Sequence, residues 1–98
     1  MTQTILIVDD DPVQRRLLEA AISRMGLATL TAPGGSPALD LLFSPKGEQI
    51  SLVVLDLMMP DVDGIQVLSK LRAANQELPV LVLTAKGGID SLFGRRHG

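Results

Sequence analysis

Residues 52–64 read LVVLDLMMPDVDG, and this stretch decides the fold. Its first four residues are apolar and two of them are valine, which predicts a strand buried on both faces of a parallel sheet. Asp56 follows the apolar run at once, and Pro60 and Gly64 then interrupt the backbone. The stretch therefore delivers a carboxylate to the carboxyl end of a central strand, where open α/β sheets bind their ligands.

A second acidic group follows a second apolar run. Residues 5–8 read ILIV, and Asp9, Asp10 and Asp11 come directly after them. If the two strands are parallel neighbours, Asp9 and Asp10 converge with Asp56 at one edge of the sheet. Converging carboxylates repel each other, which raises the pKa of at least one of them unless a cation compensates. Oxygen ligands with room for water suit Mg²⁺, so we expect a magnesium site here.

The acidic run also has a plainer interpretation, as a charge cluster at the N-terminus of the following helix. Negative side chains at that end favour the helix macrodipole. This interpretation has most weight for Asp11, because it precedes Pro12, a residue suited to the first helical turn. We expect Asp9 and Asp10 to serve the metal instead.

Apolar runs and breaker residues predict alternating strands and helices. Strands are expected at residues 4–8, 28–32, 52–56 and 80–83, and helices at 12–25, 37–43 and 62–75, with a loop over 44–49. Residues 28–32 are the more polar run, as an edge strand should be. Gly26 should end the first helix and Ser36 should cap the second. The first helix carries an apolar stripe of Val13, Leu17, Leu18, Ala21 and Ile22. This alternation favours right-handed crossovers and a parallel sheet.

Composition bounds the class of protein. The chain has 98 residues, of which 46% are hydrophobic and 20% charged, and residues 1–98 are expected to form one small domain. The net charge is −2 with no basic tract, so direct binding to nucleic acid is not expected. No cysteine is present, and the apolar runs are too short to span a membrane. We expect a cytoplasmic protein without a membrane association.

Three segments together resemble the receiver domain of two-component response regulators. They are residues 5–11 (ILIVDDD), 55–64 (LDLMMPDVDG) and 80–85 (VLVLTA), in that order. The resemblance covers residues 4 to 90 and implies a flavodoxin-like doubly wound parallel sheet with strand order 2-1-3-4. It also implies a phosphoacceptor domain of a phosphorelay and not an enzyme, with at most slow Mg²⁺-dependent self-phosphorylation and dephosphorylation.

The resemblance assigns roles to individual residues. It implies that Asp56 takes a phosphoryl group from a sensor histidine kinase or a phosphotransfer protein. It implies that Mg²⁺ is held by Asp10 and Asp56 directly, by Asp9 through water, and by the backbone carbonyl of Met58. Thr84 is expected to offer its hydroxyl to a phosphoryl oxygen, although a threonine at a strand end also fits simple β-propensity. The run after the fourth strand looks most like receivers attached to ATPase-type transcription activators.

The resemblance fails near the end of the chain. The family continues with a fifth strand that bears a phosphate-contacting lysine, and with a last helix. A strand and a helix with their connections need roughly 20–25 residues, so residues 91–98 (SLFGRRHG) are expected to be a divergent tail of an incomplete domain. Lys86 lies only two residues after Thr84 and does not match the family lysine. His97, near the end of the chain, is expected to have no role.

A missing fifth strand and last helix would expose surface. The fourth strand would become an unpaired edge, and the sheet face near the first helix would expose aliphatic side chains, so a homo-oligomer is expected. The alternative function is a non-switching receiver remnant that acts as an interaction or oligomerisation module. The absent lysine favours this alternative, whereas the intact aspartates favour phosphorylation. A phosphatase of the haloacid dehalogenase type is excluded because Met58 occupies the place of its second aspartate.

Overall fold

The computed structural model describes residues 3–57, 64–74 and 77–83 of the chain. Four parallel strands form one sheet in the order β2-β1-β3-β4, which confirms the predicted order 2-1-3-4. The strands are β1 (Thr4–Val8), β2 (Ala28–Ala32), β3 (Ile50–Asp56) and β4 (Val80–Leu83). The third strand begins two residues earlier than predicted, and the polar strand β2 lies on an edge as expected.

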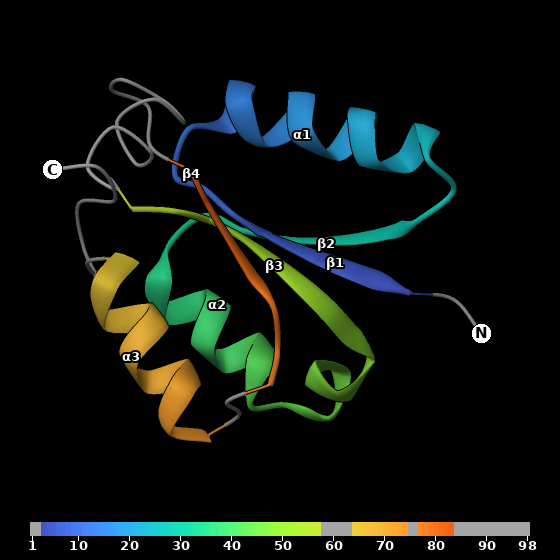
Figure 1. The fold of residues 1–98 in the computed structure, drawn as a ribbon. Helices are drawn as coiled ribbons and strands as arrows, with labels where there is room; N and C mark the ends of the chain where they lie inside the picture. Colours follow the sequence, from blue (N-terminus) through green and yellow to red (C-terminus); the bar gives the residue numbers. More distant parts are fainter. Residues whose placement is uncertain (1–2, 58–63, 75–76, 84–98) are drawn as a thin grey trace, which may run out of the picture.

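Helices cover both faces of the sheet. They are α1 (Pro12–Arg24), α2 (Gly35–Leu42) and α3 (Gly64–Ala74), with a short 3₁₀ helix η1 (Pro45–Gln49) in the segment predicted as a loop. Figure 1 shows α1 on one face, and α2 and α3 on the other. Two-sided coverage explains why β1 and β3 are almost wholly apolar. In the part of the chain that the structure describes, no helix is long and apolar enough to cross a membrane.

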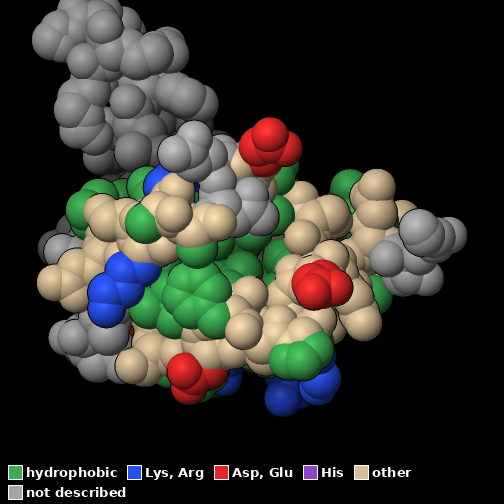
Figure 2. Space-filling model, turned by 90° about the horizontal axis from the view of Figure 1, so that it is seen from below, with side chains coloured by type: hydrophobic (Ala, Val, Ile, Leu, Met, Phe, Trp, Pro, Cys, Tyr) green, Lys and Arg blue, Asp and Glu red, His purple; other side chains and the backbone are tan. Residues whose placement is uncertain are grey.

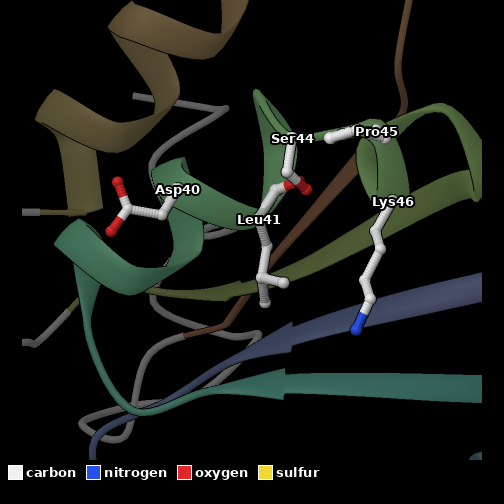
Figure 3. A pocket seen from close by; sticks show the side chains of 5 residues that line it. All are labelled: Asp40, Leu41, Ser44, Pro45 and Lys46. Carbon is white, nitrogen blue, oxygen red and sulfur yellow. The ribbon is translucent and has the colours of Figure 1, made fainter.

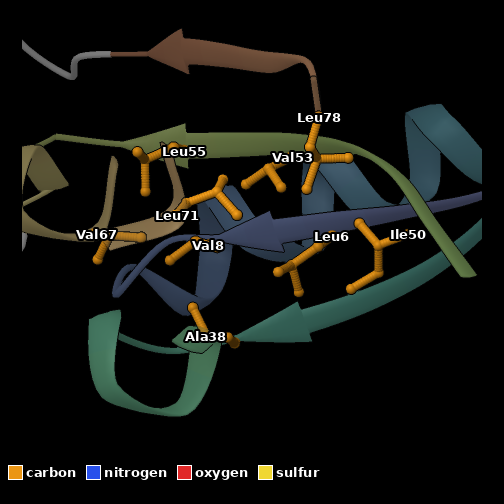
Figure 4. Packing of buried hydrophobic residues seen from close by; sticks show 10 residues of the cluster. Leu6, Val8, Ala38, Ile50, Val53, Leu55, Val67, Leu71 and Leu78 are labelled. Carbon is orange, nitrogen blue, oxygen red and sulfur yellow. The ribbon is translucent and has the colours of Figure 1, made fainter. Parts of the chain in front are cut away.

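The main core lies between the sheet and the pair α2–α3. Its members come from the sheet, from both helices and from the approach to β4: Leu6, Val8, Ala32, Ala38, Ile50, Val53, Leu55, Val67, Leu71 and Leu78 (Figure 4). Leu6, Val53 and Val67 are fully buried. Complete burial of such a side chain stabilises the fold by about 1.5–3 kcal/mol. This layer holds the strand ends of β1 and β3 in a fixed relation.

The α1 face is packed less deeply. None of the residues of α1 is buried, and Val13 and Leu17 of its apolar stripe are 67% and 66% exposed. The helix contacts β1 and β2, and of the five stripe residues only Leu18 and Ile22 are partly buried. On β4, Leu81 is 52% exposed. The predicted aliphatic exposure near the first helix is therefore confirmed among the described residues.

The opposite side of the molecule exposes apolar groups too. Phe43 at the end of α2 is 57% exposed, and Ile65 at the start of α3 is 53% exposed. Seen from below in Figure 2, hydrophobic side chains gather in the middle of this side and charged side chains lie around them. The α1 side and the α2–α3 side of the molecule therefore both expose apolar side chains.

Helix ends follow capping chemistry. Asp11 caps α1, since its side chain accepts a hydrogen bond from the Val13 N–H at 2.9 Å. Gly26 has φ +85°, a left-handed conformation that favours glycine, which confirms that it ends α1. The predicted Ser36 cap of α2 is wrong. Gly34 caps that helix, because its carbonyl accepts the Ala38 N–H at 3.2 Å and so begins the helical pattern two residues earlier.

Candidate metal centre

The pairing register of β1 and β3 places two aspartates side by side at the end of the sheet. Val8 pairs with Leu55 in the parallel ladder, so Asp9 and Asp56, each one residue further along, reach the carboxyl edge of the sheet together. The Asp9 N–H donates to the carbonyl of Ala32 on β2 at 3.1 Å, which continues the ladder to this point. Both side chains are nearly inaccessible, at 1% and 4% exposure. Sheet geometry alone therefore delivers two buried carboxylates to one place.

Asp10 completes a cluster of three carboxylates. One oxygen from each of Asp9, Asp10 and Asp56 lies within 4.8 Å of the other two, which confirms the predicted convergence. Asp10 is the most open to solvent of the three. Negative charges at this spacing repel each other, and burial strengthens the repulsion because the local dielectric is low. The cluster therefore favours a cation or a proton.

The two side-chain oxygens of Asp9 have different surroundings. Oδ1 accepts a hydrogen bond from the Asp11 N–H at 2.9 Å. Oδ2 is buried, and within residues 3–57, 64–74 and 77–83 no group donates a hydrogen bond to it. A buried acceptor without a donor costs about 1–3 kcal/mol, so this oxygen is suited to a metal ion or a proton.

Asp9 is also the electrostatically perturbed member of the cluster. Burial raises its pKa above the ordinary value of 3.8, and the negative charges of Asp56 and Asp10 raise the pKa further. The hydrogen bond from the Asp11 N–H partly opposes these effects, because it stabilises the carboxylate form. A divalent cation at the cluster would reverse the balance and hold Asp9 ionised.

The donor set fits Mg²⁺. All three groups offer carboxylate oxygens, which are the ligands that this hard cation prefers. Mg²⁺ keeps several of its waters, and the more open Asp10 leaves room for them. The buried Oδ2 of Asp9 accepts no hydrogen bond from the described residues, so it is available to the ion or to one of the waters of the ion. The carboxylate donors and the open side at Asp10 therefore suit Mg²⁺.

The other predicted site residues fall in different places. Asp11 turns its side chain to α1 and caps the helix, which agrees with the expected place of Asp11 at the helix N-terminus and adds a hydrogen bond that was not predicted. Met58 and Thr84 lie outside the described residues, so the proposed Met58 carbonyl ligand and Thr84 hydroxyl contact stay predictions. Lys86 and His97 lie outside them as well.

One residue beside the cluster was not predicted from the sequence. Arg15 on the first turn of α1 donates from Nη1 to the carbonyl oxygen of Asp9 at 2.8 Å. The available signal was its position, because side chains on a helix tilt toward the N-terminus and a basic residue on the first turn reaches back toward the preceding loop.

A separate hollow lies at the other end of the fold, where α2 passes into η1. It is about 450 Å³ in volume and is lined by Asp40, Leu41, Ser44, Pro45 and Lys46 (Figure 3). The Ser44 hydroxyl donates to the Leu41 carbonyl at 2.7 Å, so this polar group is already satisfied. The hollow sits before β3 begins, away from the carboxyl edge that holds the aspartates. It contributes nothing to the metal centre.

Comparison with known proteins gives consistent matches. The family model of the response regulator receiver domain matches residues 5–93. The probable transcriptional regulatory protein TcrX of Mycobacterium tuberculosis is 41% identical over 87 residues, which is 89% of this chain and 36% of TcrX. The chain thus spans little more than a third of the length of the curated relatives that it matches.

Solved structures share the arrangement of the sheet. The response regulator TrrA of Thermotoga maritima, in complex with Mg²⁺ and BeF, has a TM-score of 0.80 and 34% identity, covering 86% of this chain and 70% of that one. The complex of the histidine kinase ThkA with TrrA gives a TM-score of 0.78, 34% identity and the same coverage of 86% and 70%. The parallel sheet with helices on both faces is common to these proteins and this chain.

Proposed function

Because the chain belongs to the family of response regulator receiver domains, we propose that Asp56 accepts a phosphoryl group in a two-component signalling relay. The observation that carries this proposal is the cluster of Asp9, Asp10 and Asp56 at the carboxyl edge of the sheet. The proposed donor is a phosphohistidine on a sensor histidine kinase or a phosphotransfer protein. The complex of the similar protein TrrA with the kinase ThkA supports that choice.

The chemistry requires an in-line nucleophile and charge neutralisation. A carboxylate oxygen of Asp56 attacks the phosphorus and forms the new P–O bond. The P–N bond to the donor imidazole breaks, and its electron pair stays on the imidazole nitrogen. Phosphoryl transfer needs little other covalent help, so positioning and electrostatics supply most of the rate. Asp56 lies at the end of β3, which pairs with β1 on one side and β4 on the other, so the sheet holds its backbone in place.

The residues proposed to hold Mg²⁺ are Asp10 and Asp56 directly, Asp9 through water, and Met58 through its backbone carbonyl. When bound, the ion neutralises charge on the phosphoryl oxygens. Asp9 and Asp10 would hold the ion at the cluster, and the charge of the ion would offset the repulsion between these carboxylates and an incoming phosphoryl group. Thr84 is proposed to donate its hydroxyl to a phosphoryl oxygen.

Thermal unfolding with a phosphoryl mimic tests this function. We expect Mg²⁺ plus beryllofluoride to raise the Tm of the 98-residue chain, and neither additive alone to give the full shift. A ligand at a hundredfold excess over its Kd stabilises the native state by about 2.7 kcal/mol, which corresponds to a Tm shift of about 10–20 °C in a domain of this size. An Asp56→Asn variant should lose the shift that needs both additives.

Asp40→Asn is the matched control, because Asp40 is an exposed aspartate on α2 away from the cluster. It should keep the full shift. A wild-type chain that unfolds cooperatively at the same temperature with and without both additives would contradict the proposed phosphoacceptor function.

The chain is further proposed to be the receiver part of a transcription regulator that acts in the cytoplasm, where ATP-derived phosphoryl groups are made. The name of the relative TcrX supports a regulatory output, and the chain spans 36% of that protein. Such output would reside in sequence beyond the part that this chain matches. This chain itself, with a net charge of −2, is proposed not to bind nucleic acid directly.

A second candidate function is self-association, with or without switching. Within the described chain, β4 pairs with β3 alone, and Leu81 on β4 is 52% exposed. Val13 and Leu17 on α1 add apolar surface on the same side of the sheet. Edges and apolar patches of this kind favour pairing with a second copy. Light scattering over a range of concentrations tests it, and a monomer throughout would contradict it.

A further inference from the structure

Arg15 connects α1 to the backbone of the carboxylate cluster. Its Nη1 donates to the carbonyl oxygen of Asp9 at 2.8 Å. That carbonyl belongs to the peptide group that joins Asp9 to Asp10, so the hydrogen bond restrains the unit between two of the clustered aspartates. The Arg15 side chain is partly buried, whereas that of the next residue, Arg16, is exposed.

The rest of the turn is closed by hydrogen bonds that do not reach this carbonyl. The Asp9 N–H donates to Ala32, and the Asp11 N–H donates to Oδ1 of Asp9. The carbonyl of Asp11 accepts the backbone N–H of Arg15 at 2.9 Å, which begins α1. Arg15 therefore holds the turn twice, through its backbone at Asp11 and through its guanidinium at Asp9. The second contact restrains the peptide that leads into Asp10.

We propose that Arg15 is a positioning residue for the metal centre. By fixing the peptide between Asp9 and Asp10, it keeps the more exposed Asp10 carboxylate beside Asp9 and Asp56 and so raises the affinity for Mg²⁺. This role rests on the proposed function, since it concerns the same site. Arg15 acts through the backbone and does not contact the ion.

Two effects of Arg15 have opposite signs. Its positive charge opposes binding of a cation, so loss of charge alone would tighten Mg²⁺ binding. Its hydrogen bond orders the ligands, so loss of that bond weakens Mg²⁺ binding. Contacts that orient metal ligands typically change metal affinity by about 10–100-fold when removed. A single charge near solvent has a smaller effect, which salt reduces further. The loss of positioning therefore outweighs the loss of charge, and removal of Arg15 should weaken Mg²⁺ binding.

A titration with Mg²⁺ alone tests the inference. The chain contains neither Trp nor Tyr, so binding is followed by ¹H–¹⁵N NMR of backbone amides in the 98-residue protein. We expect Arg15→Gln to raise the Kd for Mg²⁺ by about tenfold. Arg16→Gln removes the same charge from the neighbouring exposed position, and its Kd should match that of the wild type. The effect of Arg15→Gln should persist at about 0.5 M salt, where the Debye length is only a few Å.

Arg15→Lys keeps the charge and loses the planar guanidinium, so it should weaken Mg²⁺ binding as well, and it serves if Arg15→Gln does not fold. A purely structural role would lower the Tm of the metal-free protein and leave the Kd unchanged. That result, or a Kd that falls in Arg15→Gln, would overturn the inference while the proposed function stands. A folded wild-type chain that does not bind Mg²⁺ at millimolar concentration would overturn both.

Discussion

Gly64, the first residue of α3, lies against the backbone of Leu57. A Cβ on Gly64 would stand 2.6 Å from the Cα of Leu57 and 2.9 Å from the carbonyl oxygen of Asp56. Real Cβ atoms do not approach backbone so closely. The start of α3 is therefore packed directly on the residue that follows β3, and a glycine at this point lets the helix approach the proposed phosphoacceptor.

Gly64→Ala should disturb both stability and the metal centre. The added methyl group must displace the backbone at Asp56 and Leu57, and such overpacking costs about 1–3 kcal/mol of the free energy of unfolding. Because Asp56 moves, the affinity for Mg²⁺ should fall as well. Denaturant unfolding and a Mg²⁺ titration measure the two effects.

Gly26→Ala is the matched control for that substitution. Gly26 has φ +85°, and a Cβ added there would meet no atom of the described residues within 4 Å, so alanine brings only backbone strain of about 1–2 kcal/mol. It should lower stability and leave Mg²⁺ affinity unchanged. Equal effects of the two substitutions on Mg²⁺ affinity would contradict the argument from Gly64.

Asp9→Asn should stabilise the metal-free protein at neutral pH. Burial raises the pKa of Asp9, so the folded state holds the proton more tightly than the unfolded state. Its contribution to the free energy of unfolding is therefore largest below the ordinary value of 3.8 and is lost as the pH rises through the raised pKa. Asparagine removes the buried charge, and we expect a gain of about 1 kcal/mol at pH 7 that shrinks toward pH 4.

Denaturant unfolding with a chelator, over that pH range, measures the difference between Asp9→Asn and wild type. Asp40→Asn, at an exposed aspartate on α2, is the control for the loss of one negative charge away from the cluster. Added Mg²⁺ should stabilise the wild type more than Asp9→Asn. A difference that grows as the pH falls would have the wrong sign and would contradict the raised pKa.

Asp11→Ala should show that the Asp11 side chain caps α1 and is not a metal ligand. Its side chain accepts the Val13 N–H at 2.9 Å, and loss of such a cap costs about 1 kcal/mol of stability. The bond from its backbone N–H to Asp9 does not need the side chain, so Mg²⁺ affinity should stay close to that of the wild type. Asp11→Asn, which also caps helices well, should restore most of the stability. A large loss of Mg²⁺ affinity in Asp11→Ala would place this carboxylate among the ligands.

The convergence of the aspartates was predictable because it depends on strand periodicity. Each of the two apolar runs is followed by an aspartate. When the two strands are parallel neighbours, the pairing of Val8 with Leu55 places Asp9 and Asp56 together at the carboxyl edge of the sheet. The α1 terminus at Gly26 followed from an equally local signal. The strand order was implied by the resemblance to receiver domains and not by residue type and spacing, because it depends on how separate strands pair.

Features that depend on packing were not predictable. Ser36 and Pro37 have the residue types of a helix start, yet the backbone at Gly34 begins α2 earlier. Val13 and Leu17 fit the apolar stripe of α1, but the helix contacts β1 and β2 in a way that leaves both side chains exposed. Both outcomes depend on how a helix packs on the sheet. The helical periodicity of the sequence carries no information about that packing.

Leu81→Lys should weaken self-association if β4 is the contact. Leu81 is 52% exposed on an edge strand within the described chain, and lysine on an edge opposes pairing with another strand. We expect the concentration at which dimers form, measured by light scattering, to rise in this variant. Because half of the side chain is already in solvent, the Tm of the monomer should change little.

Phe43→Lys provides the comparison, because Phe43 is exposed to a similar extent, 57%, but lies at the end of α2 on the other side of the sheet. It should leave association through β4 intact. If Phe43→Lys lowers association and Leu81→Lys does not, the contact lies on the α2–α3 side. Neither the β4 edge nor the α1 face would then hold the second copy, and their exposed leucines would have to be explained by a different partner.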